Sequence, residues 1–362
     1  MQETEIRAVF QGGFEIKTAF YSDPSGHDLW VSVLECLPYV PVAYTTENLD
    51  YQADYMRCFL SQLIDLSIII YHADKPIGIF PITLNINEGD VSFRTNEGPV
   101  YTPLYVTGTS EKLIRRYNVQ CLSALQKCYE YITRVRGGRA SSWESQTSFL
   151  PTPLHEQSMI WYRQLMERGA AVSVSHELYV DLHLPIEVIH QKVRKSYRSL
   201  LNEGEKLWRV DIPAEVSHEL FTEYRLLHKA VAGRETRSLR TWDAQESAIR
   251  SGAGFIVTLR NDEDELIGGA HYAVSRDEGV YAVAAYRRDL FDEPVSHVAQ
   301  WAAIRRMKEL GLRWYYVGTR FYPTDSRPPT PKELQIAYFK EGFATDFFFK
   351  MITENRFAKL EQ

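Results

Sequence analysis

A strand, a helix and a second strand follow one another directly in the last third of the sequence, and this order constrains the fold most. The strands are expected at 279–286 and 313–319, and the helix at 296–310. Strands joined through such a helix lie parallel, with a right-handed crossover. Because ligands of these sheets bind beyond the carboxyl ends of the strands, the sequence predicts a site near 286–288 and 318–320.

The start of this helix points toward the same region. Free N–H groups at a helix N-terminus favour an anion such as a phosphate. We therefore predict an anion site, and alternatively His297 only caps the helix. The candidate ligand-binding residues are Tyr286, Arg287, Arg288, Ser296 and His297.

The first half of the chain repeats the same order of elements. Each half has a strand, an acidic turn, an Ile-Gly pair and another strand, with the pairs at Ile77-Gly78 and Ile267-Gly268. A further strand and a long helix closed by glycine follow in both. We interpret this as a duplicated α/β unit in which 60–136 corresponds to 255–312. The alternative is a chance match between two ordinary hairpins.

The spacing of apolar residues and the turn signals predict the other elements. In the first half we expect helices at 55–66 and 110–136, the latter capped by Ser110 and stopped by Gly137-Gly138, and strands at 67–71 and 77–84. In the second half we expect helices at 154–168, 186–204, 214–230 and 243–251, a strand at 171–182 and a hairpin over 255–274.

The length of 362 residues predicts two or three domains. The polar, proline-bearing segment 140–156 is the candidate junction, so we expect an N-terminal half at 1–150 and a C-terminal half at 151–362. The fold class is α/β with mixed sheets, in two tandem halves. A net charge of −6 does not fit a general binder of polyanions.

The four cysteines lack C-x-x-C spacing, so no metal site is predicted. Cys121 and Cys128 lie two helical turns apart and are expected as small buried side chains. The N-terminus lacks the features of a signal peptide, and no window approaches 18 apolar residues. A cytoplasmic location without a membrane span is the expectation.

Three segments of the second half, in a fixed order, resemble the FemAB-like branch of the GNAT (Gcn5-related) acyltransferase superfamily. They are the strand–helix–strand stretch 179–210, the central unit 284–319, and IAYFKEGFATD at 336–346. The last is similar to the family's Phe-Lys-x-Gly-Phe-Gly motif, with Ala344 in place of the final glycine. The first half matches the family only in outline.

The resemblance implies a tandem GNAT-like fold and transfer of an acyl group to an amine. The donor would be acyl-CoA, such as acetyl-CoA, and the acceptor an amino sugar, a nucleotide sugar or a cell-surface precursor. The usual pyrophosphate loop, Arg/Gln-x-x-Gly-x-Gly/Ala, corresponds here to 287–293, which lacks glycine. Relatives that use aminoacyl-tRNA often insert a helical arm that is not evident here. Two alternatives stay open: an aminoacyl-tRNA-dependent transferase of the peptidoglycan type, and an inactive binding module.

The resemblance also suggests catalytic residues. Lys340, after Phe339, matches a lysine that lies beside the reacting carbonyl in tRNA-dependent relatives, where an ammonium stabilises an oxyanion. Alternatively it is a surface lysine in a turn. His271 is a candidate general base for the amine, or else a buried structural histidine.

Two basic segments are candidates for binding an anionic acceptor. Arg194 and Arg198 are four residues apart and share a helix face; a solvated basic face is the alternative. The segment 228–242 contains His228, Arg234 and Arg237, with only Glu235 to balance its arginines. We expect an anion site in this loop.

Overall fold

The computed structural model describes residues 2–88, 90–96, 98–136, 142–325 and 327–357, and its contacts divide the chain into two compact units. Unit 1 comprises Met1–Tyr39, Tyr44–Val174 and Phe349–Gln362, and unit 2 comprises Val40–Ala43 and Ser175–Phe348. The chain passes from one unit to the other on both sides of residues 40–43 and within the strands β10 (Ala171–Asp181) and β16 (Asp346–Arg356). The boundaries of these units lie at other residues than the expected boundary near residue 150. They are units of contact density, so the division into domains at 1–150 and 151–362 stays a prediction.

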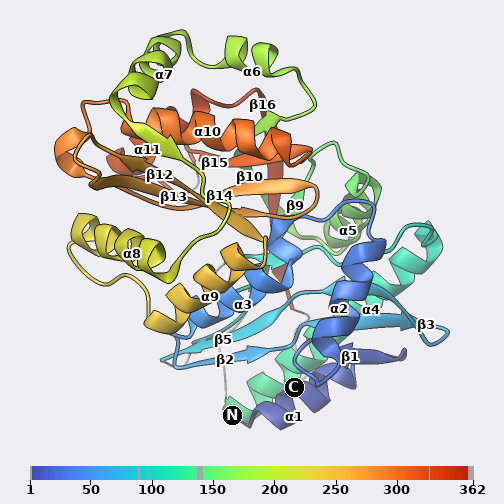
Figure 1. Cartoon of the computed structure of the whole chain (residues 1–362). Coiled ribbons are helices and arrows are strands. Elements are labelled where there is room, and N and C mark those ends of the chain that lie inside the picture. The colour runs from blue at the N-terminus through green and yellow to red at the C-terminus, as the bar shows by residue number, and fades with distance from the viewer. Residues whose placement is uncertain (1, 89, 97, 137–141, 326, 358–362) are drawn as a thin grey trace. The chain divides into compact units, whose positions relative to one another are not determined.

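Unit 1 combines helices with three groups of strands (Figure 1). Its elements are α1 (Glu3–Gln11), β1 (Thr18–Phe20), α2 (Gly26–Cys36), the 3-10 helix η1 (Val42–Tyr44, shared with unit 2), α3 (Thr46–Met56), β2 (Gln62–Asp65), β3 (Ile68–His72), β4 (Lys75–Phe80), β5 (Thr83–Asn87), β6 (Asp90–Arg94), β7 (Val100–Tyr101), β8 (Leu104–Tyr105), α4 (Glu111–Arg136), β9 (Ser142–Ser148) and α5 (His155–Glu167). The strands are ordered β1-β3-β4-β8, β2-β5-β6 and β16-β9-β7, and β7 runs parallel to β9.

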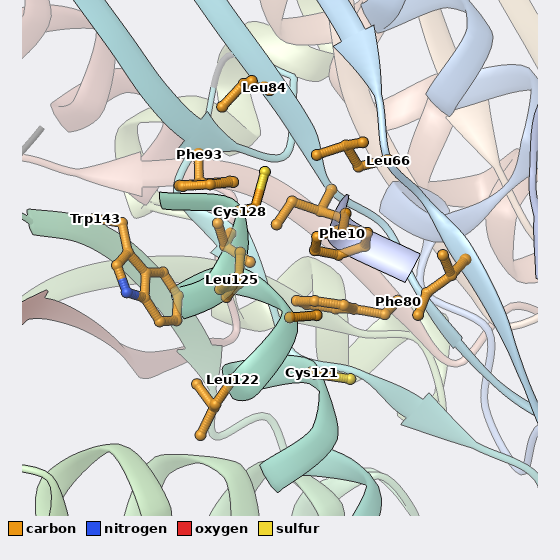
Figure 2. Packing of buried hydrophobic residues seen from close by; sticks show 14 of the residues in the cluster. Phe10, Leu66, Phe80, Leu84, Phe93, Cys121, Leu122, Leu125, Cys128 and Trp143 are labelled. Carbon is orange, nitrogen blue, oxygen red and sulfur yellow. The ribbon is translucent and has the colours of Figure 1, made fainter. Parts of the chain in front are cut away.

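The core of unit 1 is built around α4, as the helical pattern of the sequence predicts. The inward face of α4 includes Cys121, Leu125 and Cys128, which pack against Phe10 and Phe80 (Figure 2). Burial raises the pKa of the Cys128 thiol to about 12, which fits the small buried side chain that was expected. Ser110 precedes the helix as predicted, and Gly137-Gly138 lie outside the described residues.

Two predictions for unit 1 are wrong. Residues 62–65 form strand β2 rather than the end of a helix. The strand expected at 77–84 is two strands, β4 and β5, in different sheets. Residues 142–148 of the polar segment 140–156 form strand β9, whose alternate side chains Trp143, Ser145 and Thr147 are buried, and the junction between halves stays a prediction.

Unit 2 agrees more closely with the elements expected from the sequence. Its elements are β10 (Ala171–Asp181), α6 (Ile186–Lys192), α7 (Lys195–Leu207), β11 (Arg209–Asp211), α8 (His218–Ala232), α9 (Leu239–Arg250), β12 (Gly254–Arg260), β13 (Leu266–Val274), β14 (Glu278–Tyr286), the 3-10 helix η2 (Arg288–Leu290), α10 (Val295–Glu309), β15 (Trp314–Arg320), α11 (Pro331–Glu341) and β16 (Asp346–Arg356).

Its strands are ordered β11-β12-β13-β14-β15-β10, and only β14 and β15 pair in parallel within this run. Helix α10 packs on one face of β12, β13 and β14, while α8 and α9 cover the other face (Figure 1). This arrangement is the parallel strand–helix–strand unit that the sequence predicts. The two faces of this sheet carry different polar groups.

Candidate active site

The strands β14 and β15 separate soon after they pair. Their parallel register ends at Val280 and Tyr316. The register of β14 against β13 shifts at Ala282, and that of β15 against β10 shifts at Val317. A bulge leaves one residue outside the ladder and bends its strand. The two bulges therefore open a gap between the strands at the level of Tyr281 and Gly318.

Lys340 lies over this gap. It stands in the last turn of α11, and its side chain packs directly against the Cα of Gly318, where a Cβ would overlap it. Its ammonium lies 5.4 Å from the centre of the Tyr281 ring on the other strand. The φ of Gly318 is +145°, a conformation that favours glycine. The sequence motif thus delivers a lysine to the point where the strands diverge.

The positive charge of the Lys340 ammonium is only weakly balanced by its neighbours. Within the described part of the chain it makes no hydrogen bond and no ion pair. Burial lowers its pKa, and the negative charge of Glu177 partly opposes that effect. A half-buried ammonium of this kind is suited to bind an oxygen that becomes negative during a reaction.

Tyrosine hydroxyl groups and an amide lie between the diverging strands and α10. Burial raises the pKa values of Tyr281 and Tyr286, so both keep their protons at neutral pH. Gln300 of α10 is fully buried; its Oε1 accepts a hydrogen bond from Tyr315, and its Nε2 has no partner among the described residues. The cluster can therefore donate hydrogen bonds to a ligand.

The reasoning from sequence missed three of these residues. Glu177, Tyr281 and Gln300 belong to three different elements, and no local motif connects them. Glu177 is 1% exposed, and its charge acts on both Lys340 and the Tyr316 hydroxyl. A carboxylate in the middle of the strand 171–182 was the available signal, since buried acids are rare without a partner or a role.

The predicted general base, His271, lies on the opposite face from α10. It opposes Ile256 and Val283 in the sheet register, and both belong to the cluster beneath α8 and α9. Burial, followed by the positive charge of Arg237, lowers the pKa of His271 to about 3. It is neutral at physiological pH but a weak proton acceptor.

The comparisons with known proteins agree with this geometry. The model of the acetyltransferase (GNAT) domain family matches residues 191–324. The structure of FemX superposes with a TM-score of 0.63 at 10% identity, covering 93% of this chain and 97% of that one. The L-PGS of Bacillus licheniformis gives 0.58 at 13% identity, covering 93% of each chain. No curated protein matches the sequence.

A third similar structure is a C-terminal domain assigned to a lysylphosphatidylglycerol synthetase of Agrobacterium fabrum. Its TM-score is 0.53 at 12% identity, covering 91% of each chain. At such identities the likeness establishes the fold, and the family model adds the acyltransferase domain. The chain has the fold of FemX and of L-PGS. The matched segment, residues 191–324, contains the parallel pair β14–β15.

Arg287 and Arg288, which are expected to hold the pyrophosphate of CoA in this GNAT domain, differ from each other in their neighbours. Arg287 pairs with Asp289 at 2.6 Å and with Glu265 at 2.8 Å. Arg288 is exposed and makes no ion pair with the described residues. Two carboxylates thus compete with any phosphate for Arg287, whereas Arg288 has no such competitor.

The N-terminus of α10, expected as the anion site, is partly covered by α7. The His297 ring lies 4.5 Å from that of Tyr197 and 5.1 Å from that of Phe339. Burial and the charge of Arg194 lower its pKa to about 4. His297 therefore packs as a neutral aromatic ring, and Phe339 supports it. Ser296 is half-buried beside it.

Arg194 and Arg198 are engaged within the GNAT domain. Arg194 donates to the Tyr197 hydroxyl at 2.7 Å and to the Tyr338 carbonyl at 2.9 Å. Arg198 donates to the backbone carbonyls of Val193 and Gln191. These bonds hold α6, α7 and α11 together, so we do not retain the two arginines in the binding site.

The loop between α8 and α9 contains two of the predicted anion-binding residues, Arg234 and Arg237, and they point in different directions. Its one acid, Glu235, pairs with Lys229 at 3.0 Å and with Arg225 at 3.9 Å. Arg234 is exposed, whereas Arg237 turns inward and donates to His228 Nε2 at 3.3 Å.

Within the described ranges, no group of histidine, cysteine, aspartate and glutamate side chains could hold a metal ion, and no helix has the length and apolarity to cross a bilayer.

Proposed function

We propose that the chain transfers an acyl group from acyl-CoA to the amine of an anionic acceptor, such as an amino sugar, a nucleotide sugar or a cell-surface precursor. The observation that carries the proposal is the half-buried ammonium of Lys340, without an ion pair, over the gap between β14 and β15. A carbonyl in that gap would have its oxygen within reach of this cation.

The reaction is a direct attack. The neutral amine nitrogen forms a bond to the acyl carbon, and the carbonyl oxygen becomes an oxyanion that Lys340 stabilises. The C–S bond then breaks, the oxyanion returns to a carbonyl, and the proton lost by the amine balances the leaving thiolate. No covalent enzyme intermediate is needed.

A second candidate is an aminoacyl-tRNA-dependent transferase. The missing glycines in 287–293 and the two carboxylates on Arg287 favour it, because both weaken a pyrophosphate site of the usual GNAT type. The names of FemX and of the lysylphosphatidylglycerol synthetase domain also suggest aminoacyl transfer. The same gap and the same lysine would serve an ester carbonyl.

Donor choice is tested by binding and by turnover. Calorimetry with acetyl-CoA should detect binding that Arg288→Ala weakens more than Arg287→Ala, since Arg287 is already paired. Acyl transfer to a panel of amino sugars and nucleotide sugars would complete the test. No binding of CoA together with turnover that depends on charged tRNA would establish the second candidate instead. Binding without turnover of either donor would indicate an inactive module.

The role of Lys340 is tested by Lys340→Met, with Lys332→Met as the matched control, because Lys332 is exposed on the same helix. Loss of an oxyanion donor should lower kcat by roughly 10²-fold or more with little change in KM. The melting temperature should hold, because methionine replaces a cation that is half-buried without an ion pair. Equal kcat values for the two variants would make Lys340 an ordinary lysine.

A further inference from the structure

A buried carboxylate lies close to the strand gap, outside the sequence motif that supplies the lysine. Glu177 is 1% exposed and stands on β10, where it opposes Thr319 of β15 in the antiparallel register. The next pair in that register is Leu178 with Gly318, the glycine on which Lys340 lies. Because directly opposed residues of such strands have Cα atoms about 4.5–5.5 Å apart, the carboxylate and the ammonium belong to one small region of unit 2.

The bulge at Val317 shapes the surroundings of Glu177. In a regular strand, residues three apart point to opposite faces, yet the hydroxyl groups of Tyr316 and Thr319 lie 3.0 Å apart. The extra residue in the register of β15 brings them to the same side. Ser175 donates to Glu177 Oε1 at 3.3 Å, and the charge of Glu177 adds to burial in raising the pKa of the Tyr316 hydroxyl. The bulge that opens the gap thus also places hydroxyl groups around this carboxylate.

The other charged or titratable groups packed around Lys340 are paired or neutral. Glu341, the next residue of α11, forms ion pairs with Arg320 of β15 at 3.1 Å and with Arg194 at 3.7 Å. Burial lowers the pKa of His297 on α10 to about 4 and raises the pKa values of the two tyrosines of β14, so these side chains are uncharged at neutral pH. Among the described residues, the negative charge that acts on the ammonium is therefore that of the buried carboxylate on β10.

The spacing between Glu177 and Lys340 has a chemical consequence. Without an acid nearby, a lysine held in a site of low dielectric constant loses its proton easily and then cannot stabilise an oxyanion. In direct contact, a carboxylate would occupy the N–H groups that the oxyanion needs. Glu177 avoids both results, because its charge opposes the effect of burial on the pKa of Lys340 although these two described side chains form no ion pair with each other.

We propose that Glu177 is a positioning residue that keeps the Lys340 ammonium charged while leaving its N–H groups free to bind the acyl oxygen. This rests on the proposed acyl transfer and explains how a lysine enclosed between strands can serve as its oxyanion donor. Glu177 acts only through Lys340 and contacts neither substrate. Its removal should therefore change the pH range of turnover rather than the affinity for the acceptor.

The first test titrates Lys340 directly and needs no turnover. The whole protein is labelled with trace acetic anhydride from about pH 7 to about pH 10, and mass spectrometry of the peptide that contains Lys340 gives the acetylated fraction at each pH. Glu177→Gln keeps the volume of the side chain and an acceptor for Ser175. In this variant the pKa of Lys340 should be lower than in wild type by about one pH unit or more. Glu177→Asp, which retains the charge, should stay closer to wild type.

Thr319→Val is the matched control, because it disturbs the same group of side chains without changing a charge. It removes the hydroxyl that lies 3.0 Å from the Tyr316 hydroxyl, on the residue opposite Glu177. The pKa of Lys340 should remain that of wild type, and melting temperatures of both variants report any general loosening of the sheet. An equal decrease in the pKa of Lys340 in Glu177→Gln and Thr319→Val, or no decrease in either, would show a merely structural role and overturn the proposal.

The second test measures turnover with acetyl-CoA and an amino sugar that the protein accepts. Activity should decline at high pH as Lys340 loses its proton, and Glu177→Gln should move this decline to lower pH by the amount found in the labelling experiment. The decline at low pH belongs to the amine of the acceptor and should not move. The acceptor KM near pH 7 should stay within about twofold of wild type.

The outcomes separate this proposal from the proposed function. A pKa of Lys340 that is insensitive to Glu177→Gln would overturn the role of Glu177 and leave the acyl-transfer assay unaffected. A lowered pKa in a protein that transfers no acyl group would keep the coupling between the two side chains and reject the reaction. A lowered pKa with an unshifted pH profile of kcat would reject the role of Glu177 in an active enzyme.

Discussion

Both units contain a parallel strand pair joined through a long helix, β7 with β9 in unit 1 and β14 with β15 in unit 2, but their polar groups differ. In unit 1 the region is closed by hydrogen bonds. Gln157 binds both backbone groups of Tyr105, the Tyr105 hydroxyl donates to Asn118, and Asn118 donates to Gln164. Each of these buried side chains has a partner inside the protein.

In unit 2 several polar groups, on both faces of the sheet, have no partners within the described residues. Lys340 has no ion pair, and Gln300 Nε2, Gln245 and His271 have unpaired buried atoms within the described residues. Unit 1 also has exceptions, such as the hydroxyl groups of Thr18 and Thr147, but these are single groups on separate strands. Proteins accept such local costs at functional sites. We therefore expect the network of unit 1 to contribute to folding stability, and we expect the chemistry in unit 2.

The strongest test of this contrast is Gly318→Ala. A Cβ at Gly318 would overlap the Lys340 side chain and displace its ammonium from the gap. We expect kcat to fall by roughly 10²-fold, as for loss of the lysine itself. Gly108→Ala in unit 1 is the control, because Gly108 also has a positive φ, of +86°, but open space around it.

Both substitutions put alanine at a positive φ and strain the backbone by on the order of 1–3 kcal/mol. Only Gly318→Ala should alter steady-state kinetics once protein concentration is corrected for unfolded material. If the two variants had the same kcat, the position of Lys340 over β15 would be irrelevant to turnover.

Asn118→Leu tests the other side of the comparison. The change leaves the Tyr105 hydroxyl and the Gln164 amide oxygen buried without their partner. We expect a loss of about 1–3 kcal/mol in the free energy of unfolding, measured with urea, and an unchanged kcat for the folded fraction. A variant of normal stability with reduced kcat would place part of the chemistry in unit 1.

Much of unit 2 could be predicted from the sequence because its signals are local. The strand–helix–strand order and the Phe-Lys motif lie in short contiguous segments, and the structure has the predicted elements there. Strand β9 could not be predicted in the same way. Its buried positions include Ser145 and Thr147, so its inward face lacks the apolar residues whose alternation would predict a strand.

The site was predicted only in part, for a related reason. Lys340 stands out as a charged residue in a motif, and the structure puts it at the strand gap. Gln300 and Glu177 look like ordinary helix and strand residues, and their significance depends on being buried, which is a property of the tertiary fold. The engagement of Arg194 by Tyr197 and Tyr338 could not be read from a charge pattern either.

The smallest expected effect is on the free energy of unfolding at acidic pH. In the folded protein the pKa of His297 is lowered to about 4, while an unfolded chain has the ordinary value near 6.5. Between these values the unfolded state binds more protons, so the free energy of unfolding decreases as pH falls from about 6.5 to 4. Partial exposure of the ring keeps the slope below about 1 kcal/mol per pH unit.

His297→Phe should remove this slope, because phenylalanine keeps the packing against Tyr197 and Phe339 without a titrating nitrogen. Urea midpoints measured from pH 7.5 to 4.5 should converge for wild type and variant at the upper end, where both states are neutral, and separate at the lower end. His271, with a pKa near 3, and His228, whose pKa burial also lowers, would contribute to the pH dependence that remains below pH 6.5 in the variant. If wild type and His297→Phe lost stability in parallel, His297 would be solvated and its site beside α10 would be open to a ligand, which would restore the anion site expected from the sequence.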